Sequence, residues 1–501
     1  MDQAGEDVGR HSGRHRHHRH RSRYGRDGGA IGWPAGGLLL FLFLVLVIAA
    51  PIPMGGNRDW AWSPPVMVVS VIAMLCALGV GTASDSFGLK DAERRPMLLL
   101  VGSFAVMALF AVLQMLPLLP NPASAPAYAL VRGILSDTRA TIPSMASDLT
   151  FYALLRCLGC ALFFLVGRSL CRDEAGARLL LYALLVSAII VVAYGFYMQQ
   201  AWHSCYVGNF IKKPPPYVPN LDRCLMSGTF VGSNNFACFL GMGLVAAVAL
   251  LFGDRPAVAL DEQGGEEDDE EYSSPLAAWV TGTRLALLAT ILVCLGGILM
   301  SGSRAGFVAT VAAVLAVIVL MMRGRPRRRG TVRRMIIIGT VIALVVGLIA
   351  GGALLRKYAS FRDIQSYDRF QIWSVSLDLL RKAPLVGWGM GAYGDAYTFN
   401  QPEGDLIFND RAHSTPYEAL DEQGIPVGLI TWLILLVPWW VCLRGAAAND
   451  RLRYLVVGAF GVTAVATFHS LVDFSLQIPA ISFIVSAMLG MGWARAVARS
   501  D

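Results

Sequence analysis

The sequence predicts an all-α, polytopic membrane protein with about twelve transmembrane helices. Of its 501 residues, 55% are hydrophobic and only 15% are charged, whereas about 25% of the residues in soluble domains are charged. Apolar runs recur along the chain, many close to the roughly 20 residues that a helix needs to cross the hydrocarbon layer. These runs lack the alternation of a half-buried strand, and an unclosed sheet would leave backbone groups without partners in lipid.

Twelve apolar runs qualify as spans. They lie at residues 36–52, 65–82, 97–119, 149–166, 179–198, 230–252, 285–300, 306–322, 335–354, 425–443, 454–469 and 480–493. An even number places both termini on one side of the membrane. The positive-inside rule identifies that side as the cytoplasm, because basic runs such as Arg323–Arg329 then lie inside. We expect one transmembrane domain over residues 36–501, with its core at 149–495.

Two cytoplasmic segments have unusual charge. Residues 1–35 form a tail rich in arginine and histidine, which we expect to be disordered and to contact anionic lipid. A histidine-rich tract can also bind a metal. The predicted loop at 253–284 contains the acidic run Glu266–Glu271, and such like-charge blocks are normally solvated.

The outer loop at 355–424, between the ninth and tenth spans, is expected to be folded. Apolar positions at helical spacing predict a helix over Tyr367–Arg381, and a glycine-rich turn follows at 387–391. A second short helix should begin after the N-cap residue Thr415, with Glu418 completing a capping box. Gly424 should end that helix.

Outside the tail the chain has only three histidines, His203, His413 and His469, all near the outer face. His413 lies two residues before the expected cap at Thr415. A helix N-terminus favours anions, and a histidine there can take a proton from a hydroxyl while a phosphate is bound nearby. A histidine that only caps the helix or bonds within the loop explains the same spacing.

Three arginines near the outer face are candidate phosphate ligands, because the guanidinium fork matches phosphate oxygens. Arg156 lies inside the fourth span, Arg304 lies in a tight outer turn, and Arg369 begins the first loop helix. Each has a structural alternative. Arg156 can extend to the interface, Arg304 can bind lipid headgroups, and Arg369 can pair with Asp368.

Other polar residues lie where spans meet the outer face. Asn234 and Asn235 open the sixth span. His469 and Asp473 share a helical face if the eleventh helix persists, and we favour a structural hydrogen bond between them over a proton relay. No Asp-x-Asp pair occurs in an outer segment, and no phosphate-binding or dinucleotide-binding glycine motif appears. We therefore expect no metal, no cofactor and no nucleic-acid partner.

Five sequence blocks resemble the O-antigen ligase and O-antigen polymerase superfamily. They are Gly-Thr-Phe-Val-x-x-Asn-Asn-Phe-Ala at 228–237, Ser-Gly-Ser-Arg-Ala-Gly at 301–306, the Asp-Arg-Phe-x-x-Trp and glycine-rich block at 368–393, the Ala-His-Ser block at 412–429, and the His-Ser-Leu-Val-Asp-Phe block at 469–480. The resemblance covers spans four to twelve and depends on the order of the blocks. Ser414 is a departure, because the family often has asparagine there.

The resemblance implies a metal-independent glycosyltransferase of the C-type membrane fold, in the bacterial inner membrane with its site facing the periplasm. An acceptor hydroxyl would attack a glycan linked to undecaprenyl pyrophosphate. His413 would orient or deprotonate that acceptor, while Arg304, Arg369 and Arg156 would bind the pyrophosphate. Supporting roles would fall to Asn235, Ser414, His469 and Asp473. The acceptor is lipid A-core for a ligase and a lipid-linked repeat unit for a polymerase. The sequence does not decide between a ligase and a polymerase.

A twelve-helix secondary transporter is the alternative from another class. Twelve spans, internal termini and a long loop after the sixth span also fit a major-facilitator carrier, and residues 85–95 faintly resemble that family's loop motif. The folded outer loop at 355–424 disfavours this interpretation. A pure scaffold is disfavoured as well, because it needs no arginines and histidine near one face.

Overall fold

The structure is a computed structural model that describes residues 34–81, 89, 91–118, 143–201, 225–253, 281–323, 364–402, 409–447 and 452–498. Most of the basic tail, most of the acidic loop, the predicted span at 335–354, His203 and two stretches of the long outer loop lie outside the described residues. Every regular element within those ranges is a helix. The all-α prediction is confirmed for this part of the chain.

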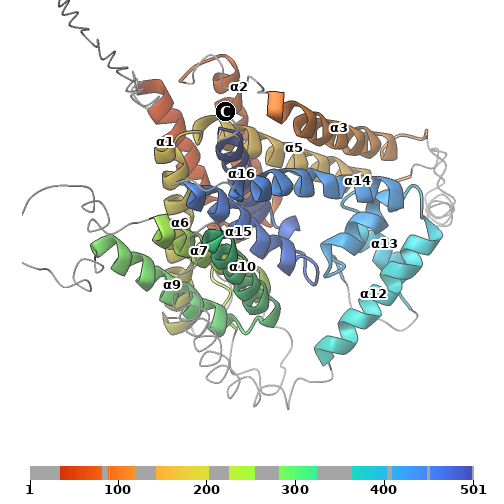
Figure 1. The fold of residues 1–501 in the computed structure, drawn as a ribbon. Helices are drawn as coiled ribbons and strands as arrows, with labels where there is room; N and C mark the ends of the chain where they lie inside the picture. Colours follow the sequence, from red (N-terminus) through yellow and green to blue (C-terminus); the bar gives the residue numbers. More distant parts are fainter. Residues whose placement is uncertain are drawn as a thin grey trace, which may run out of the picture.

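Fifteen helical elements follow one another along the described chain. They are α1 (Pro34–Ala49), η2 (Met54–Gly56), α2 (Asp59–Ala77), α3 (Asp91–Gln114), α5 (Ser147–Leu170), α6 (Glu174–Ala201), α7 (Ser233–Gly253), α9 (Gly282–Ser301), α10 (Arg304–Met322), α12 (Ile364–Lys382), α13 (Tyr393–Asn400), α14 (Thr415–Ala446), α15 (Arg453–His469), η4 (Ser475–Gln477) and α16 (Pro479–Val497). Figure 1 shows their arrangement.

Eleven of the twelve predicted spans coincide with one of these helices. Among the described residues, nine helices are long and apolar enough to cross a membrane, and two shorter apolar helices lie at Ala35–Ala49 and Arg453–His469. The chain is therefore a multi-pass membrane protein, while the count of twelve stays a prediction. Helices α7 and α16 are the most buried of the nine. The outer helices expose large apolar side chains such as Met67, Leu109 and Leu292, as a lipid-covered surface requires.

One end of the bundle brings together residues from several predicted blocks. Helices α10 and α15 pack together and run in opposite directions, because the Arg453 guanidinium at the start of α15 donates to the Arg323 carbonyl after α10. The end of α15 at His469 therefore lies beside the start of α10 at Arg304. Gly306 in α10 also packs against Ala237 in the first turns of α7. We call the region formed by the starts of α7, α10 and α14 and the end of α15 the site end.

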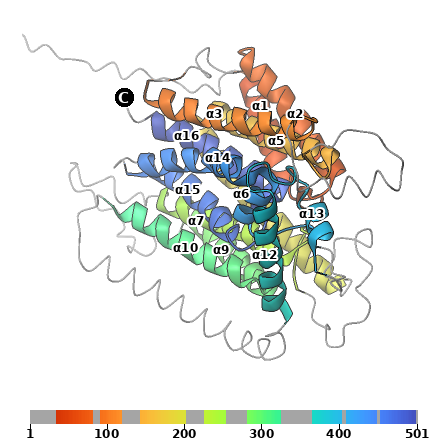
Figure 2. The same ribbon diagram turned by 90° about the vertical axis from the view of Figure 1, so that its right-hand side faces the viewer.

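The described residues between the ninth and tenth predicted spans are folded, with α12 where a helix was predicted. Figure 2 shows α12 lying across the direction of the long helices. Its buried face packs with Trp388, Tyr393 and Tyr397 in a small core of its own. The amide of Trp388 donates to the Asp421 carbonyl at 3.0 Å, so the glycine-rich turn joins α12 to α14. Helix α13 was not predicted.

The start of α14 corrects the predicted cap by one residue. Ser414 is the N-cap, with extended backbone at φ −161°, and Thr415 is the first helical residue. The Thr415 amide donates to the Ser470 carbonyl at 2.9 Å, so a tertiary contact replaces the predicted capping box. Gly424 breaks the helix at φ 71° and ψ 167° as expected, but the helix resumes and continues to Ala446 as the tenth predicted span.

Candidate functional site

A buried carboxylate lies at the centre of the site end. Asp473 follows α15, and its side chain is 1% exposed. Its Oδ2 accepts a hydrogen bond from Asn234 Nδ2 at 2.8 Å, and its Oδ1 accepts from the Phe474 amide at 2.8 Å. Two further groups approach it: Arg369 Nη2 lies 3.5 Å from Oδ2, and His413 Nδ1 lies 3.6 Å from Oδ1. Asp473 therefore contacts Asn234 of α7, Arg369 of α12 and His413, which lies just before α14.

The partners of Asp473 keep its carboxyl ionised. Burial raises the pKa of Asp473, but the contact with His413 and the charge of His469 outweigh burial, so the pKa lies below its ordinary value of 3.8. The carboxylate is therefore negative at neutral pH. Two of its neighbours are only partly buried, since the Arg369 side chain is 34% exposed and the His413 side chain is 31% exposed. A ligand can reach these two groups, whereas Asp473 itself is covered.

His413 has a strained backbone. Its φ of +50° is in the left-handed region, which only one other non-glycine residue adopts in the described chain, Met54. This conformation costs a residue with a Cβ roughly 1–2 kcal/mol. After His413, the Ser414 hydroxyl donates to the Leu471 carbonyl at 3.0 Å. The imidazole packs edge-on against the Phe474 ring, with 5.0 Å between ring centroids. Strain held by surrounding contacts is typical of functional positions.

The predicted arginines Arg369 and Arg304 lie at or near the site end. Arg369 approaches Asp473 as described above, while the side chain of Asp368, its predicted alternative partner, lies outside the described residues. Arg304 is exposed and begins α10 directly after the cap residue Ser303, whose hydroxyl accepts from the Gly306 amide at 3.1 Å. The starts of α7, α10 and α14 all present positive helix-dipole ends in this region. The site end is therefore suited to an anion.

His469 and Asn235 form a separate buried chain of hydrogen bonds. Helix α15 ends at His469, so His469 and Asp473 do not lie along one helical face. Instead His469 Nδ1 lies 2.7 Å from the Ser475 hydroxyl, and that hydroxyl donates to Asn235 Oδ1 at 2.8 Å. Nδ1 of His469 must then be the donor to Ser475. This geometry favours the structural interpretation of His469 that the sequence suggested.

Arg156 belongs to a different cluster from Arg369 and His413. It is half-buried in α5 and interacts through space with Arg411 and Glu422. Arg411 Nη1 lies 3.0 Å from Glu418 Oε1, and Glu418 Oε2 accepts from the Ala412 amide at 2.8 Å. We call Arg156, Arg411, Glu418 and Glu422 the Glu418 cluster. It adjoins the Asp473 site through the backbone at 412–413.

Three contributors to this region were given no role from the sequence. Asn234 contacts Asp473, although of the two amides that open the sixth span only Asn235 was given a supporting role. Arg411 was not considered, although it lies seven residues before Glu418 and so can reach it across the start of α14. Trp373 follows Arg369 by four residues, which places both on one face of α12, and its Nε1 donates to the Ala412 carbonyl at 3.0 Å. This spacing was the signal that could have identified it.

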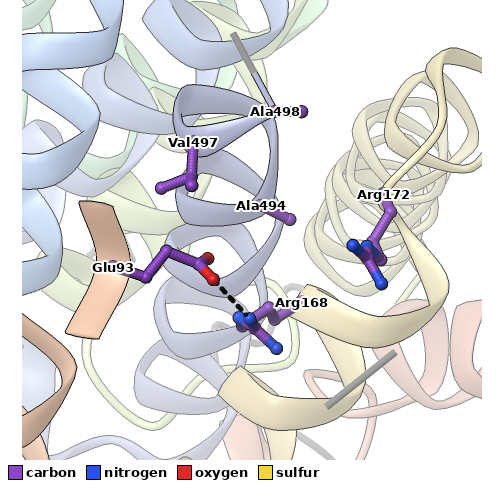
Figure 3. Close-up of a pocket in the computed structure, with 6 residues that line it drawn as sticks. All are labelled: Glu93, Arg168, Arg172, Ala494, Val497 and Ala498. Carbon is purple, nitrogen blue, oxygen red and sulfur yellow. Dashed lines mark hydrogen bonds and ion pairs between the residues drawn. The ribbon is translucent and has the colours of Figure 1, made fainter. Parts of the chain in front are cut away.

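A small cavity of about 20 Å³ lies at the opposite end of α16 from Asp473. Figure 3 shows its lining, with the Arg168–Glu93 ion pair facing α16. Arg168 Nη2 donates to Glu93 Oε2 at 2.9 Å, and Trp493 Nε1 donates to Glu93 Oε1 at 3.0 Å. The lining residues Ala494, Val497 and Ala498 lie roughly 22–28 Å along the helix from Pro479, the first residue of α16. No residue of the Asp473 site lines it.

Comparison with known proteins identifies the region that carries these residues. Residues 288–433 match the family model of the O-antigen ligases. The match includes Arg304, Arg369 and His413, and it extends from α9 into α14. No curated protein matches the chain. The match favours an enzyme of polysaccharide biosynthesis, of the ligase or polymerase type, over a carrier. Residues 288–433 of the chain are therefore similar to the O-antigen ligases, and this match covers less than half of the chain.

Proposed function

We propose that the protein is a glycosyltransferase that moves a glycan from undecaprenyl pyrophosphate to a sugar hydroxyl at the periplasmic face of the inner membrane. The observation that carries this proposal is the placement of the buried Asp473 carboxylate between His413 and Arg369. Both of those residues lie in the part of the chain that matches the O-antigen ligases. The site end would then face the periplasm, with both termini in the cytoplasm.

Arg369 and Arg304 are the proposed ligands of the donor pyrophosphate. Arg369 is partly exposed beside Asp473, and Arg304 is exposed at the start of α10. Guanidinium groups bind phosphate oxygens with two parallel hydrogen bonds, and the nearby helix starts add a positive potential. We assign Arg156 an indirect role, because Arg411 and Glu422 of the Glu418 cluster are among the charged groups that act on it.

His413 is the proposed base. Its Nδ1 faces Asp473, so Nε2 is the nitrogen that would take the proton from the acceptor hydroxyl. The acceptor oxygen forms a bond to the anomeric carbon as the bond from that carbon to the pyrophosphate oxygen breaks. The electron pair of the broken bond stays on the pyrophosphate, whose charge the arginines stabilise. Asp473 stabilises the imidazolium that forms on His413.

Neighbouring residues keep these groups in place. Ser414 fixes the backbone after His413 through its bond to the Leu471 carbonyl. Asn235 and His469 join the start of α7 to the turn that carries Asp473, through Ser475.

Lipid A-core and a lipid-linked repeat unit both present the required hydroxyl, so we propose an acceptor of this class. Membrane lipids surround the protein, and we propose that the reaction needs no metal.

The test is the initial rate of His413→Ala with purified donor and either acceptor. A positioned base typically contributes about 10²- to 10⁴-fold, so the variant should lose activity in that range. It should still bind the lipid-linked donor, because the arginines carry that binding. His469→Ala is the comparison. Near-normal rates for His413→Ala, together with a large loss in a folded His469→Ala protein, would move the base to His469 and contradict the assignment.

A further inference from the structure

We infer that Trp373 and Glu418 are positioning residues that hold the backbone on both sides of the Ala412 Cα so that the imidazole of His413 stays beside Asp473. The inference rests on the proposed role of His413 and adds two residues to the machinery. Neither residue touches the reacting atoms in this account. Both act on the backbone just before the strained histidine.

The two peptide groups that meet at Ala412 are each held by one side chain. The Ala412 N–H donates to Glu418 Oε2 at 2.8 Å, and the Ala412 carbonyl accepts from Trp373 Nε1 at 3.0 Å. Ala412 is fully buried, so water does not replace either partner. The Trp373 bond therefore fixes the plane of the peptide that leads into His413, and the Glu418 bond fixes the plane of the peptide before it.

The backbone on the other side of His413 is fixed as well. The Ser414 hydroxyl bonds to the Leu471 carbonyl, and the Thr415 amide bonds to the Ser470 carbonyl. His413 is thus the residue between two immobilised segments, and its left-handed φ of +50° is the conformation that joins them. If the Ala412 peptide were released, His413 could relax to an ordinary conformation and its ring would leave Asp473.

Glu418 is suited to this role and unsuited to acting as a base. Its side chain is fully buried, and both carboxylate oxygens are engaged, one by the Ala412 amide and the other by Arg411 at 3.0 Å. An acceptor hydroxyl therefore cannot reach it. Trp373 adds a second link, because it lies one turn after Arg369 on α12. The same hydrogen bond that holds Ala412 thereby joins the arginine that binds the donor to the histidine that serves as base.

The primary test is Trp373→Phe, which removes the N–H donor and keeps an aromatic ring near Phe370 and Tyr417. A shift of about 1 Å in a catalytic group can cost about 100-fold, so we expect kcat to fall by about 10- to 100-fold. The KM for the lipid-linked donor and the melting temperature should stay near wild type. Trp440→Phe is the matched control, because Trp440 is 54% exposed on the outer face of α14 and its replacement should leave kcat unchanged.

A second comparison tests Glu418 without leaving Arg411 as an unpaired charge, because both variants also carry Arg411→Met. Arg411→Met with Glu418→Ala removes the acceptor of the Ala412 amide. Arg411→Met with Glu418→Gln also removes the ion pair but keeps an amide oxygen that can accept from Ala412. If positioning is the role, the double variant with glutamine should be at least about 10-fold faster than the one with alanine. Equal rates for the two would contradict a role through the Ala412 amide.

The His413→Ala variant in the same assay distinguishes a failure of the positioning role from a failure of the proposed function. Loss of activity in His413→Ala with wild-type kcat in Trp373→Phe would overturn the positioning role and leave the proposed function intact. Full activity in His413→Ala would refute the proposed base instead. A fall in kcat of Trp373→Phe that comes with an equal loss of donor affinity and a lower melting temperature would also count against positioning, because it would indicate general disruption of the fold.

Discussion

Replacing Asp473 by asparagine removes one negative charge from the centre of the site with little change in shape. Asparagine can still accept from the Phe474 amide, but it cannot balance the positive charges of Arg369 and of a protonated His413. If His413 gains a proton in the transition state, the charge of Asp473 stabilises the transition state more than the ground state. The variant should therefore lower kcat more than it changes donor binding.

The separation of the two groups sets the size of the effect. His413 Nδ1 and Asp473 Oδ1 are 3.6 Å apart, which corresponds to an interaction of about 1 kcal/mol in water and about 5 kcal/mol at an effective dielectric constant of 20. The imidazole is partly exposed, so solvent screening places the value in the lower part of that range, about 1–3 kcal/mol. Asp473→Asn should then reduce kcat by about 5- to 160-fold.

The assay is the initial rate with purified lipid-linked donor and acceptor in detergent or nanodiscs. Asp378→Asn is the control, because Asp378 forms an exposed ion pair with Arg381 on α12, and its loss should have no measurable effect. A folded Asp473→Asn protein that keeps its rate within twofold, in a preparation where His413→Ala is inactive, would refute the electrostatic reasoning.

The same substitution has a consequence for stability in acid. The pKa of Asp473 is lower in the folded protein than its ordinary value of 3.8. A group of this kind stabilises the fold above its unfolded pKa, and that contribution is lost as the pH falls through the folded pKa. The melting temperature of the wild type should therefore fall more steeply below about pH 4 than that of Asp473→Asn.

Two further predictions concern the donor site and the topology. Arg304→Ala and Arg369→Ala should each abolish glycan transfer at normal protein levels, and lysine should restore little, since a point charge lacks the paired donors of a guanidinium group; wild-type rates in both alanine variants would exclude the pyrophosphate role. A reporter fused after Gly404 should be periplasmic and one fused after Gly324 cytoplasmic, and the reverse pattern would place every proposed site residue in the wrong compartment.

The sequence predicts the fold well because the bilayer fixes the length and polarity of each span. Eleven runs were located by apolar length alone, and each coincides with a helix. Helix α13 (Tyr393–Asn400) was missed for a physical reason. It is short, and it forms around Tyr393 and Tyr397, which are buried against α12. Its stability comes from tertiary packing, and a local pattern does not reveal such packing.

The sequence identifies the residue types of the site better than their partners. His413, Arg369 and Asp473 were chosen from charge, side of the membrane and family resemblance, and the structure brings them together. The predicted pairing of His469 with Asp473 assumed a helix that in fact ends at His469. Asn234 was passed over for Asn235, since neighbouring residues on a helix point about 100° apart and only the packing of α7 decides which of them faces Asp473.

The contrast between two histidines explains why the proposed base belongs before α14. His469 is fully buried, and its Nδ1 bonds to Ser475 in a chain that ends at Asn235. Removing a proton from a sugar requires that the sugar reach the ring, and this ring is covered. His413 is partly exposed and lies beside an ionised carboxylate. It also keeps a left-handed backbone conformation, which is unfavourable for most residues. A histidine that served only to cap α14 would need none of these features, because Ser414 already occupies the cap position. The strain at His413 is therefore better explained by the placement of its ring beside Asp473 than by the start of the helix.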